Sequence, residues 1–374
     1  MNYQIITQTV ELETVCQQAR TRNVVMLDTE FVRTRTFYPQ LGLIQLFDGD
    51  TLSLIDPLAI EEMSAFVALL QDTSVTKILH ACGEDLEVFQ NAFGCTPTPM
   101  IDTQIMAAFL GHGLSTGFAT LVKEYQGIEL DKSESRTDWL ARPLTQRQLE
   151  YAAADVHYLY PLYEQLFTAI QEAGWEQAVQ QECELLVQKR IRTPDLDNAY
   201  LEVKGAWLLK PSELAILKPL ATWRLQYAMQ HDLALNFVFK ENDLLMVARL
   251  GPCSMRRMEQ EKMDMRSVRR HYNHMMTLVK QAQQTPTDQY PAKIERLMDM
   301  PNYKQVFKTL KDDMKIVVQQ TGLASEFLAS KKQLNQLLSW VWCKECDPAQ
   351  LPEVMQGWRK PLFGEKLAAR LIAK

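Results

Sequence analysis

Short apolar runs alternate with helix-like stretches along the first 170 residues of the chain. Val24–Leu27, Leu41–Phe47, Leu52–Ile55 and Val75–Leu79 are rich in β-branched and large apolar residues, and polar or glycine turns bound them. These runs are typical of strands. Amphipathic helical patterns follow the last two of them, so the first part of the chain is predicted to be a mixed α/β domain.

The clearest predicted helix covers Thr145 to Phe167. It opens with a capping box, in which the side chains of Thr145 and Gln148 satisfy the backbone of the first turn. Its apolar positions recur at spacings of three and four residues, a stripe that would pack on a sheet. The members of this stripe are Ala152, Val156, Leu159 and Tyr163.

From about Lys210 onward the patterns are helical and strand-rich segments are absent from the sequence. This part repeats itself at a period of 90 residues, which indicates two copies of one helical module. The segment Gln283–Tyr303, with three prolines, is the predicted linker between the copies. The identical pairs are Lys218/Lys308, Leu220/Leu310, Gln230/Gln320, Leu233/Leu323, Ala234/Ala324, Phe237/Phe327 and Leu244/Leu334.

Charge is distributed unequally along the chain. Residues 1–200 hold 13 basic and 28 acidic side chains, net −15, whereas residues 201–374 hold 27 and 18, net +9. This asymmetry suits an enzyme that handles a polyanion, although unequal solvated surfaces would give it as well. The seven scattered cysteines and the lack of a signal or membrane-spanning segment favour a cytoplasmic protein with reduced thiols.

The sharpest chemical feature is the pair Asp28 and Glu30 at the end of an apolar run. Residues i and i+2 of a strand share a face, so the two carboxylates would converge where one divalent cation links them. Such a pair is common, and alone it does not establish a metal site.

Two further candidates follow. Asp85 comes after a predicted strand and enters a helix, where an acidic residue also simply favours the positive helix terminus. Tyr151 and Asp155 lie one turn apart on the predicted long helix, separated by three alanines that would let the helix lie close to a sheet.

Taken together, these residues resemble the DEDD superfamily of 3′-5′ exonucleases, in its tyrosine subclass, and within it the ribonuclease D family. The motifs that carry the resemblance are Leu27-Asp28-Thr29-Glu30-Phe31, Tyr38-Pro39, Leu43-Ile44-Gln45-Leu46, His80-Ala81 with Asp85, Ile101-Asp102-Thr103-Gln104, Asp138 to Leu144 and Tyr151 to Val156. The helical repeat resembles two helicase-and-RNase-D C-terminal (HRDC) domains, the second divergent. Asp313 stands there in place of Trp223.

The resemblance implies three domains. An α/β exonuclease domain with a ribonuclease H-like mixed sheet flanked by helices would cover residues 1–192. Two all-α HRDC domains would cover residues 210–289 and 294–374.

The implied activity is removal of nucleotides from RNA 3′ ends by two Mg²⁺ ions, with Mn²⁺ able to replace them. Asp28, Glu30, Asp85 and Asp155 would hold the metals, and Tyr151 would orient the attacking water. An RNA substrate, tRNA 3′ ends foremost, and a monomeric chain without a membrane partner are also implied.

Weaker expectations concern the cleft wall. Gln45 and His80 are candidates to contact the terminal nucleotide, and Arg142 is a candidate to contact phosphate. Asp102 is expected to cap the helix that follows it. Two alternative functions remain open, a DNA 3′-5′ exonuclease with the same catalytic residues and a non-catalytic nucleic-acid-binding scaffold.

Overall fold

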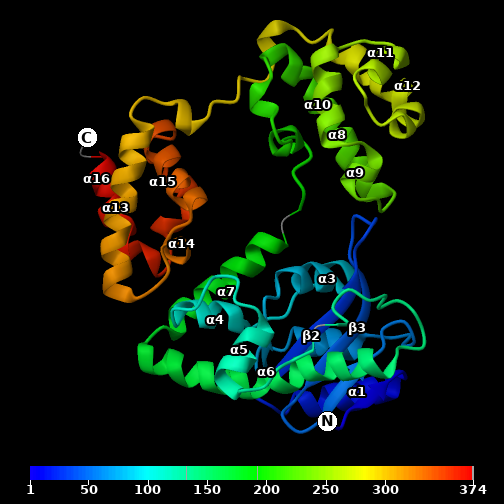
Figure 1. Ribbon diagram of the computed structural model, residues 1–374, viewed down its shortest axis with the longest axis vertical. Helices are drawn as coiled ribbons and strands as arrows, with labels where there is room; N and C mark the ends of the chain where they lie inside the picture. The colour runs from blue at the N-terminus through cyan, green and yellow to red at the C-terminus, as the bar shows by residue number, and fades with distance from the viewer. Residues whose placement is uncertain (132, 192, 373–374) are drawn as a thin grey trace. The chain divides into compact units, whose positions relative to one another are not determined.

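The computed structural model describes residues 1–131, 133–191 and 193–372 (Figure 1). The chain forms two compact units. The first contains Met1–Val32, Gln40–Ile191 and Pro301–Lys374, and the second contains Arg33–Pro39 and Arg192–Met300.

A six-stranded mixed sheet forms the centre of the first unit. Its order is β1-β4-β3-β2-β5-β6, with β3 antiparallel to β2 and β4 and the other pairs parallel. The predicted mixed α/β class is therefore confirmed. The strands are β1 (Gln4–Ile6), β2 (Val24–Val32), β3 (Gln40–Phe47), β4 (Leu52–Ile55), β5 (Thr76–Leu79) and β6 (Met100–Asp102).

Seven helices accompany the sheet among the described residues. The long α6 crosses one face of the sheet, where it packs on β2, β3 and β4 (Figure 1). The apolar layer between them includes Met26, Leu43, Ala152 and Val156. The helices are α1 (Thr9–Ala19), α2 (Ser64–Leu70), α3 (Gly83–Phe93), α4 (Thr103–Phe109), α5 (Phe118–Gln126), α6 (Gln146–Ala173) and α7 (Glu176–Arg190).

The second unit is built around the first helical module. Segment 33–39, which joins β2 to β3, belongs to this unit because Phe37 packs on its apolar core. The Tyr38 amide donates to Asp232 Oδ1 over 2.9 Å, and the Ala234 amide donates to Arg35 O over 2.8 Å. The helices are α8 (Pro211–Gln230), α9 (Leu235–Val238), α10 (Glu241–Leu250), α11 (Met255–Gln260) and α12 (Met265–Ala282).

The second helical module belongs to the first unit, together with the sheet. Its core includes Leu310, Leu334, Leu338 and Phe363, each almost fully buried. The contacts group the sheet and the second module into one unit, and the boundaries of the three domains stay a prediction. The helices are α13 (Tyr303–Thr321), α14 (Ser325–Leu328), α15 (Lys331–Cys343) and α16 (Glu365–Ile372).

No helix in the described ranges combines the length and the apolar character that crossing a membrane requires.

Candidate active site

Three carboxylates from two elements meet beside the sheet. Asp28 and Glu30 lie on β2, on the face that α6 covers, and Asp155 lies on α6. One oxygen from each side chain lies within 4.8 Å of the others. The structure therefore brings together three of the four residues that the sequence predicted as metal ligands.

The start of α6 fixes the position of Asp155. The Thr145 and Gln148 capping box is present, as predicted, and defines where the helix begins. Ala152 and Ala153 have no exposed surface, so the helix approaches the sheet closely at this point. The Tyr151 hydroxyl donates a hydrogen bond to Asp155 from one turn earlier, and the Tyr151 ring lies 6.1 Å from that of Trp139.

Asp85 approaches the cluster from α3. It lies in the first turn of that helix with 7% of its surface exposed, and its Oδ1 accepts a hydrogen bond from the Thr29 hydroxyl. It is not one of the three residues whose oxygens converge, but its charge is the second-largest cause of the raised pKa of Asp28. Asp85 is therefore close enough to act with the cluster.

Thr29 is the residue that sequence reasoning missed. It lies between the two carboxylates of β2, so its side chain points to the opposite face of the sheet. The hydroxyl that holds Asp85 is thus placed by the same strand as Asp28 and Glu30. The strand alternation in the Asp-Thr-Glu motif was the available signal.

Burial and mutual repulsion dominate the electrostatics of the cluster. Burial raises the pKa of Asp28 well above its usual range, and the charges of Asp85, Asp155 and Glu30 raise it further. Burial, then the charges of Asp155 and Asp85, raise the pKa of Glu30 to about 9. Burial also raises the pKa of Asp155 to about 7 and that of Asp85 to about 6. Among the described residues, no basic side chain contributes to these four pKa values, whereas burial raises each of them.

A divalent cation fits this donor set. Hard cations such as Mg²⁺ take carboxylate oxygens as ligands, and converging oxygens with unfavourable charge are the electrostatic signature of such a site. The acidic cluster therefore has the chemistry of a divalent-metal site.

Tyr151 serves as a hydrogen-bond donor in this environment. Burial, followed by the charges of Asp155, Glu30 and Asp28, raises the pKa of its phenol above the ordinary value. The hydroxyl therefore stays protonated at neutral pH, which favours orientation of a water molecule over removal of its proton.

Asp102 is a helix cap, as predicted. Its carboxylate accepts hydrogen bonds from the amides of Gln104, Ala81 and Cys82, at 2.8, 2.9 and 3.0 Å. The last two amides belong to the turn between β5 and α3, where Ala81 has a positive φ of 54°. Asp102 therefore also holds the turn that leads to Asp85.

The structure places Arg142 in contacts within the domain, and its contact with phosphate stays a prediction. Its guanidinium pairs with both carboxylate oxygens of Asp56, at 2.7 and 2.8 Å. The remaining N–H groups donate to the carbonyls of Gly42, Trp139 and Ala141. Because all five donors are used inside the domain, Arg142 anchors its loop to β3. Gly42 makes the close approach possible, since a Cβ there would lie 2.5 Å from Trp139 O.

Gln45 and His80 have different surroundings. Gln45 pairs with Asp28 across β2 and β3, has no exposed surface, and neither amide atom has a partner among the described residues. A substrate contact would therefore require Gln45 to be uncovered first.

His80 Nδ1 lies 2.9 Å from Thr103 Oγ1. Burial lowers the pKa of His80, so the ring is neutral at pH 7. Its contact with a terminal nucleotide stays a prediction.

Family comparisons cover most of the chain. Residues 3–171 match the 3′-5′ exonuclease family, residues 213–279 match the HRDC domain, and residues 301–367 match the ribonuclease D C-terminal HRDC domain.

Individual relatives align with the chain from end to end. The chain is 51% identical to ribonuclease D of Cronobacter turicensis over 98% of this chain and 99% of the relative. The identity to ribonuclease D of Serratia proteamaculans is 51% over 99% and 98%. The crystal structure of Escherichia coli RNase D, described as an exoribonuclease involved in structured RNA processing, superposes with a TM-score of 0.95. It is 48% identical and covers 100% of this chain and 99% of that one.

Proposed function

Because the chain belongs to the ribonuclease D family of 3′-5′ exoribonucleases, we propose that it shortens RNA 3′ ends to 5′-mononucleotides by two-metal-ion hydrolysis. The observation that carries the mechanism is the convergence of Asp28, Glu30 and Asp155 within 4.8 Å. The DEDD pattern of four carboxylates and one tyrosine supports it.

Divalent cations would stabilise the negative charge that develops on the attacking and leaving oxygens of the phosphodiester. Asp28, Glu30 and Asp155 would hold a cation, since their oxygens converge. Asp85, held by Thr29, completes the acidic set from α3. The Tyr151 hydroxyl, next to Asp155, orients the attacking water, and its raised pKa keeps its proton in place.

We propose structured RNA as the substrate class, with tRNA precursors foremost. The support is the described role of the Escherichia coli relative in structured RNA processing. An enzyme that selects RNA over DNA must contact the 2′-hydroxyl, and such contacts form in the complex with the substrate.

The test uses matched RNA and DNA oligomers labelled at the 5′ end, with Mg²⁺ or with EDTA. We expect a ladder of products shortened one nucleotide at a time on RNA with Mg²⁺, and none with EDTA or from the Asp28→Asn protein. An RNA circle of the same sequence should resist. Faster digestion of DNA than of RNA would support the DNA exonuclease instead, and RNA binding without any cleavage would support the scaffold.

A further inference from the structure

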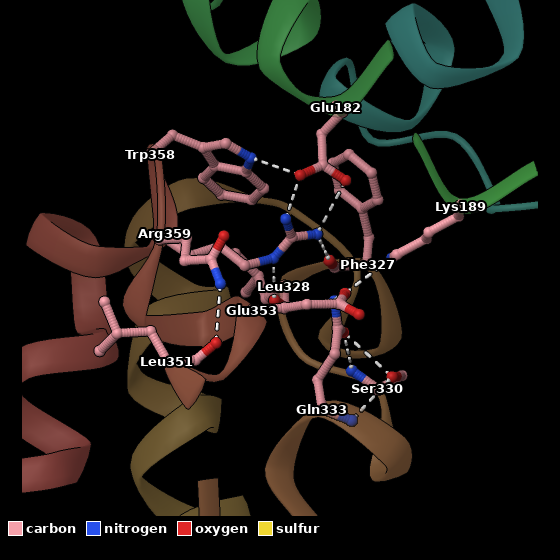
Figure 2. Close-up of polar contacts among 11 residues, drawn as sticks. Glu182, Lys189, Phe327, Leu328, Ser330, Gln333, Leu351, Glu353, Trp358 and Arg359 are labelled. Carbon is pink, nitrogen blue, oxygen red and sulfur yellow. Dashed lines mark hydrogen bonds and ion pairs between the residues drawn. The ribbon is translucent and has the colours of Figure 1, made fainter. Parts of the chain in front are cut away.

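The second helical module is joined to the catalytic domain by a buried ion pair. Arg359 has 3% of its surface exposed, and its guanidinium pairs with both carboxylate oxygens of Glu182 on α7 (Figure 2). The same guanidinium donates to the carbonyls of Phe327 and Leu328, at 2.9 and 2.8 Å. Arg359 thus ties the end of α14 to α7. Removing one partner of a buried pair leaves the other charge uncompensated, which makes the contact strongly dependent on both residues.

Neighbouring contacts make this joint specific. The Trp358 indole N–H donates to Glu182 Oε1 over 2.9 Å (Figure 2). The Trp358 backbone N–H donates to Gln181 Oε1 over 2.8 Å. Gly357, at a φ of +50°, allows this approach, because a Cβ there would lie 2.6 Å from Gln181 Oε1 and would displace that side chain. Phe327 also packs edge-on against Phe109 of α4, with ring centroids 4.7 Å apart. The joint therefore combines charge, hydrogen bonds and aromatic packing.

Further along α7, a second ion pair joins the same two parts. Lys189 Nζ lies 2.7 Å from Glu353 Oε2, and the Gln333 side chain donates to that oxygen over 2.8 Å. Glu182 and Lys189 are seven residues apart, which is about two turns of helix, so they lie on one stripe of α7. That stripe faces the second module.

The adjacent stripe of α7 faces the catalytic domain. Cys183 Sγ accepts a hydrogen bond from the Asp102 amide over 3.3 Å. Arg190 pairs with Glu87 of α3 at 2.9 Å. The Arg190 guanidinium also covers the first turn of α3, where a Cβ on Gly83 would lie 2.7 Å from Arg190 Nη2. Cys183 directly follows Glu182, and Arg190 directly follows Lys189. On α7, each contact to the second module is thus next to a contact to the catalytic domain.

The contacts of α7 lead to the turn that presents Asp85. Asp102, whose amide is held by Cys183, accepts the amides of Ala81 and Cys82 with its carboxylate. These two residues come directly before the turn of α3 that contains Asp85. A displacement of α7 would therefore disturb the turn at two points, through Asp102 and through Gly83.

We propose that the second helical module is a positioning element of the catalytic domain, in which Arg359 fixes α7 through Glu182 and α7 holds the turn that presents Asp85. The proposal rests on the proposed function in one respect, the role of Asp85 in the acidic metal set. Arg359 is a positioning residue, because it touches neither the cluster nor a substrate.

The test reverses the charge of Arg359 in the full-length protein. Arg359→Glu places two carboxylates against each other at the joint. Arg370→Glu is the matched control, because Arg370 lies in the same module and pairs with Asp313 at 2.6 Å with half of its side chain exposed. Three quantities are measured for both variants: hydrogen exchange of the Ala81 and Cys82 amides in metal-free protein, the Mg²⁺ concentration that gives half-maximal cleavage, and KM for RNA at saturating Mg²⁺.

We expect Arg359→Glu to accelerate exchange of both amides and to raise the half-saturating Mg²⁺ concentration about tenfold, the lower end for residues that support metal ligands. KM should stay at the parental value. Adding Glu182→Arg to Arg359→Glu should restore part of the amide protection, since the pair is re-formed without the bonds to the Phe327 and Leu328 carbonyls. Glu182→Gln, which keeps the shape of the side chain, should give a smaller change in the same direction.

The proposal is overturned if Arg359→Glu and Glu182→Gln both match Arg370→Glu in amide exchange and Mg²⁺ requirement. A change in KM alone would also overturn it, because the module would then act through RNA binding. A parent protein that does not cleave RNA would defeat the proposed function, while the amide exchange would still decide whether the module holds the turn.

Discussion

The acidic cluster and the polar anchors around it use the same residue types in opposite ways. Asp102 accepts three backbone amides, and Arg142 and Arg359 donate to a carboxylate and to several carbonyls. The hydrogen-bonding groups of these three side chains have partners within the protein. Asp28 and Glu30, by contrast, are surrounded by other carboxylates, and burial together with that repulsion raises their pKa values.

This difference distinguishes groups that stabilise the fold from groups that bind a ligand. A satisfied buried network makes one structure rigid, whereas buried like charges cost stability unless a cation joins them. The anchors have partners within the protein, whereas the carboxylates of the cluster repel one another. Substitutions in the two regions should have opposite consequences, with activity lost at the cluster and stability lost at the anchors.

The largest effect is expected at the centre of the cluster. Asp28→Asn removes one charge and one ligand oxygen from the convergent group, so cleavage should fall about 10³-fold or more, because metal stabilisation of the transition state is worth several kcal/mol. Steady-state cleavage of labelled RNA measures it. Asp50→Asn, at a position with 70% side-chain exposure, is the control and should keep the parental rate. Parental activity of Asp28→Asn with a native circular dichroism spectrum would remove Asp28 from the site.

A smaller loss is expected for the hydroxyl beside the cluster. Tyr151→Phe keeps the ring near Trp139 and removes the donor to Asp155, so kcat should fall about 10²-fold, toward the lower end for general acid-base groups. RNA affinity measured with Ca²⁺ should not change, since the hydroxyl acts only in the transition state. An unchanged single-turnover rate would make Tyr151 a packing residue.

The sequence predicted the members of the acidic cluster better than their surroundings. Asp28 and Glu30 share a strand face, and Tyr151 and Asp155 share a helix face, which are local properties of the chain that also carry the family resemblance. The sequence could not show the internal partner of Arg142, because Asp56 is 86 residues away and an arginine before the long helix looks the same whether its donors are used or free. Only the tertiary structure shows which donors are used.

The fold shows the same limit. The apolar runs gave β2 to β5, because each is long enough to carry a pattern. β1 and β6 were missed because they have three residues each and are defined by pairing with β4 and β5. The grouping of the second module with the sheet was also out of reach, since the Glu182 to Arg359 contact joins residues 177 positions apart.

The anchors should show the reverse behaviour. Arg142→Met leaves Asp56 without its partner and releases the loop from β3, so the free energy of unfolding should fall by about 2 kcal/mol, less than for a fully buried pair. The side chains of Arg142 and Asp56 are 27% and 12% exposed. Urea denaturation measures the loss, and the folded variant should keep kcat within a few-fold of the parent. Arg147→Met, at an arginine with 72% exposure, is the control. A stable but inactive Arg142→Met protein would place Arg142 among the substrate-binding residues.

The smallest expected effect is a gain in stability at the site itself. The pKa of Glu30 is raised to about 9 in the folded protein, above the unfolded value of 4.5, because of burial and then the charges of Asp155 and Asp85. Between these two values the folded state binds more protons than the unfolded state, so the free energy of unfolding falls as pH rises through this window. Glu30→Gln stays neutral without taking up a proton on folding, so it should raise stability at pH 8 in EDTA by about 1–2 kcal/mol, well below the full shift at about 1.4 kcal/mol per pKa unit. At pH 4 the difference should vanish.

Melting temperatures in EDTA at pH 8 and pH 4 measure this difference in stability, with the exposed Glu13→Gln as control. Saturating Mg²⁺ should reverse the order, because the cation stabilises the parent cluster more than the variant. A Glu30→Gln protein that is less stable than the parent at pH 8 in EDTA would show that Glu30 belongs with the anchors and not with the strained cluster.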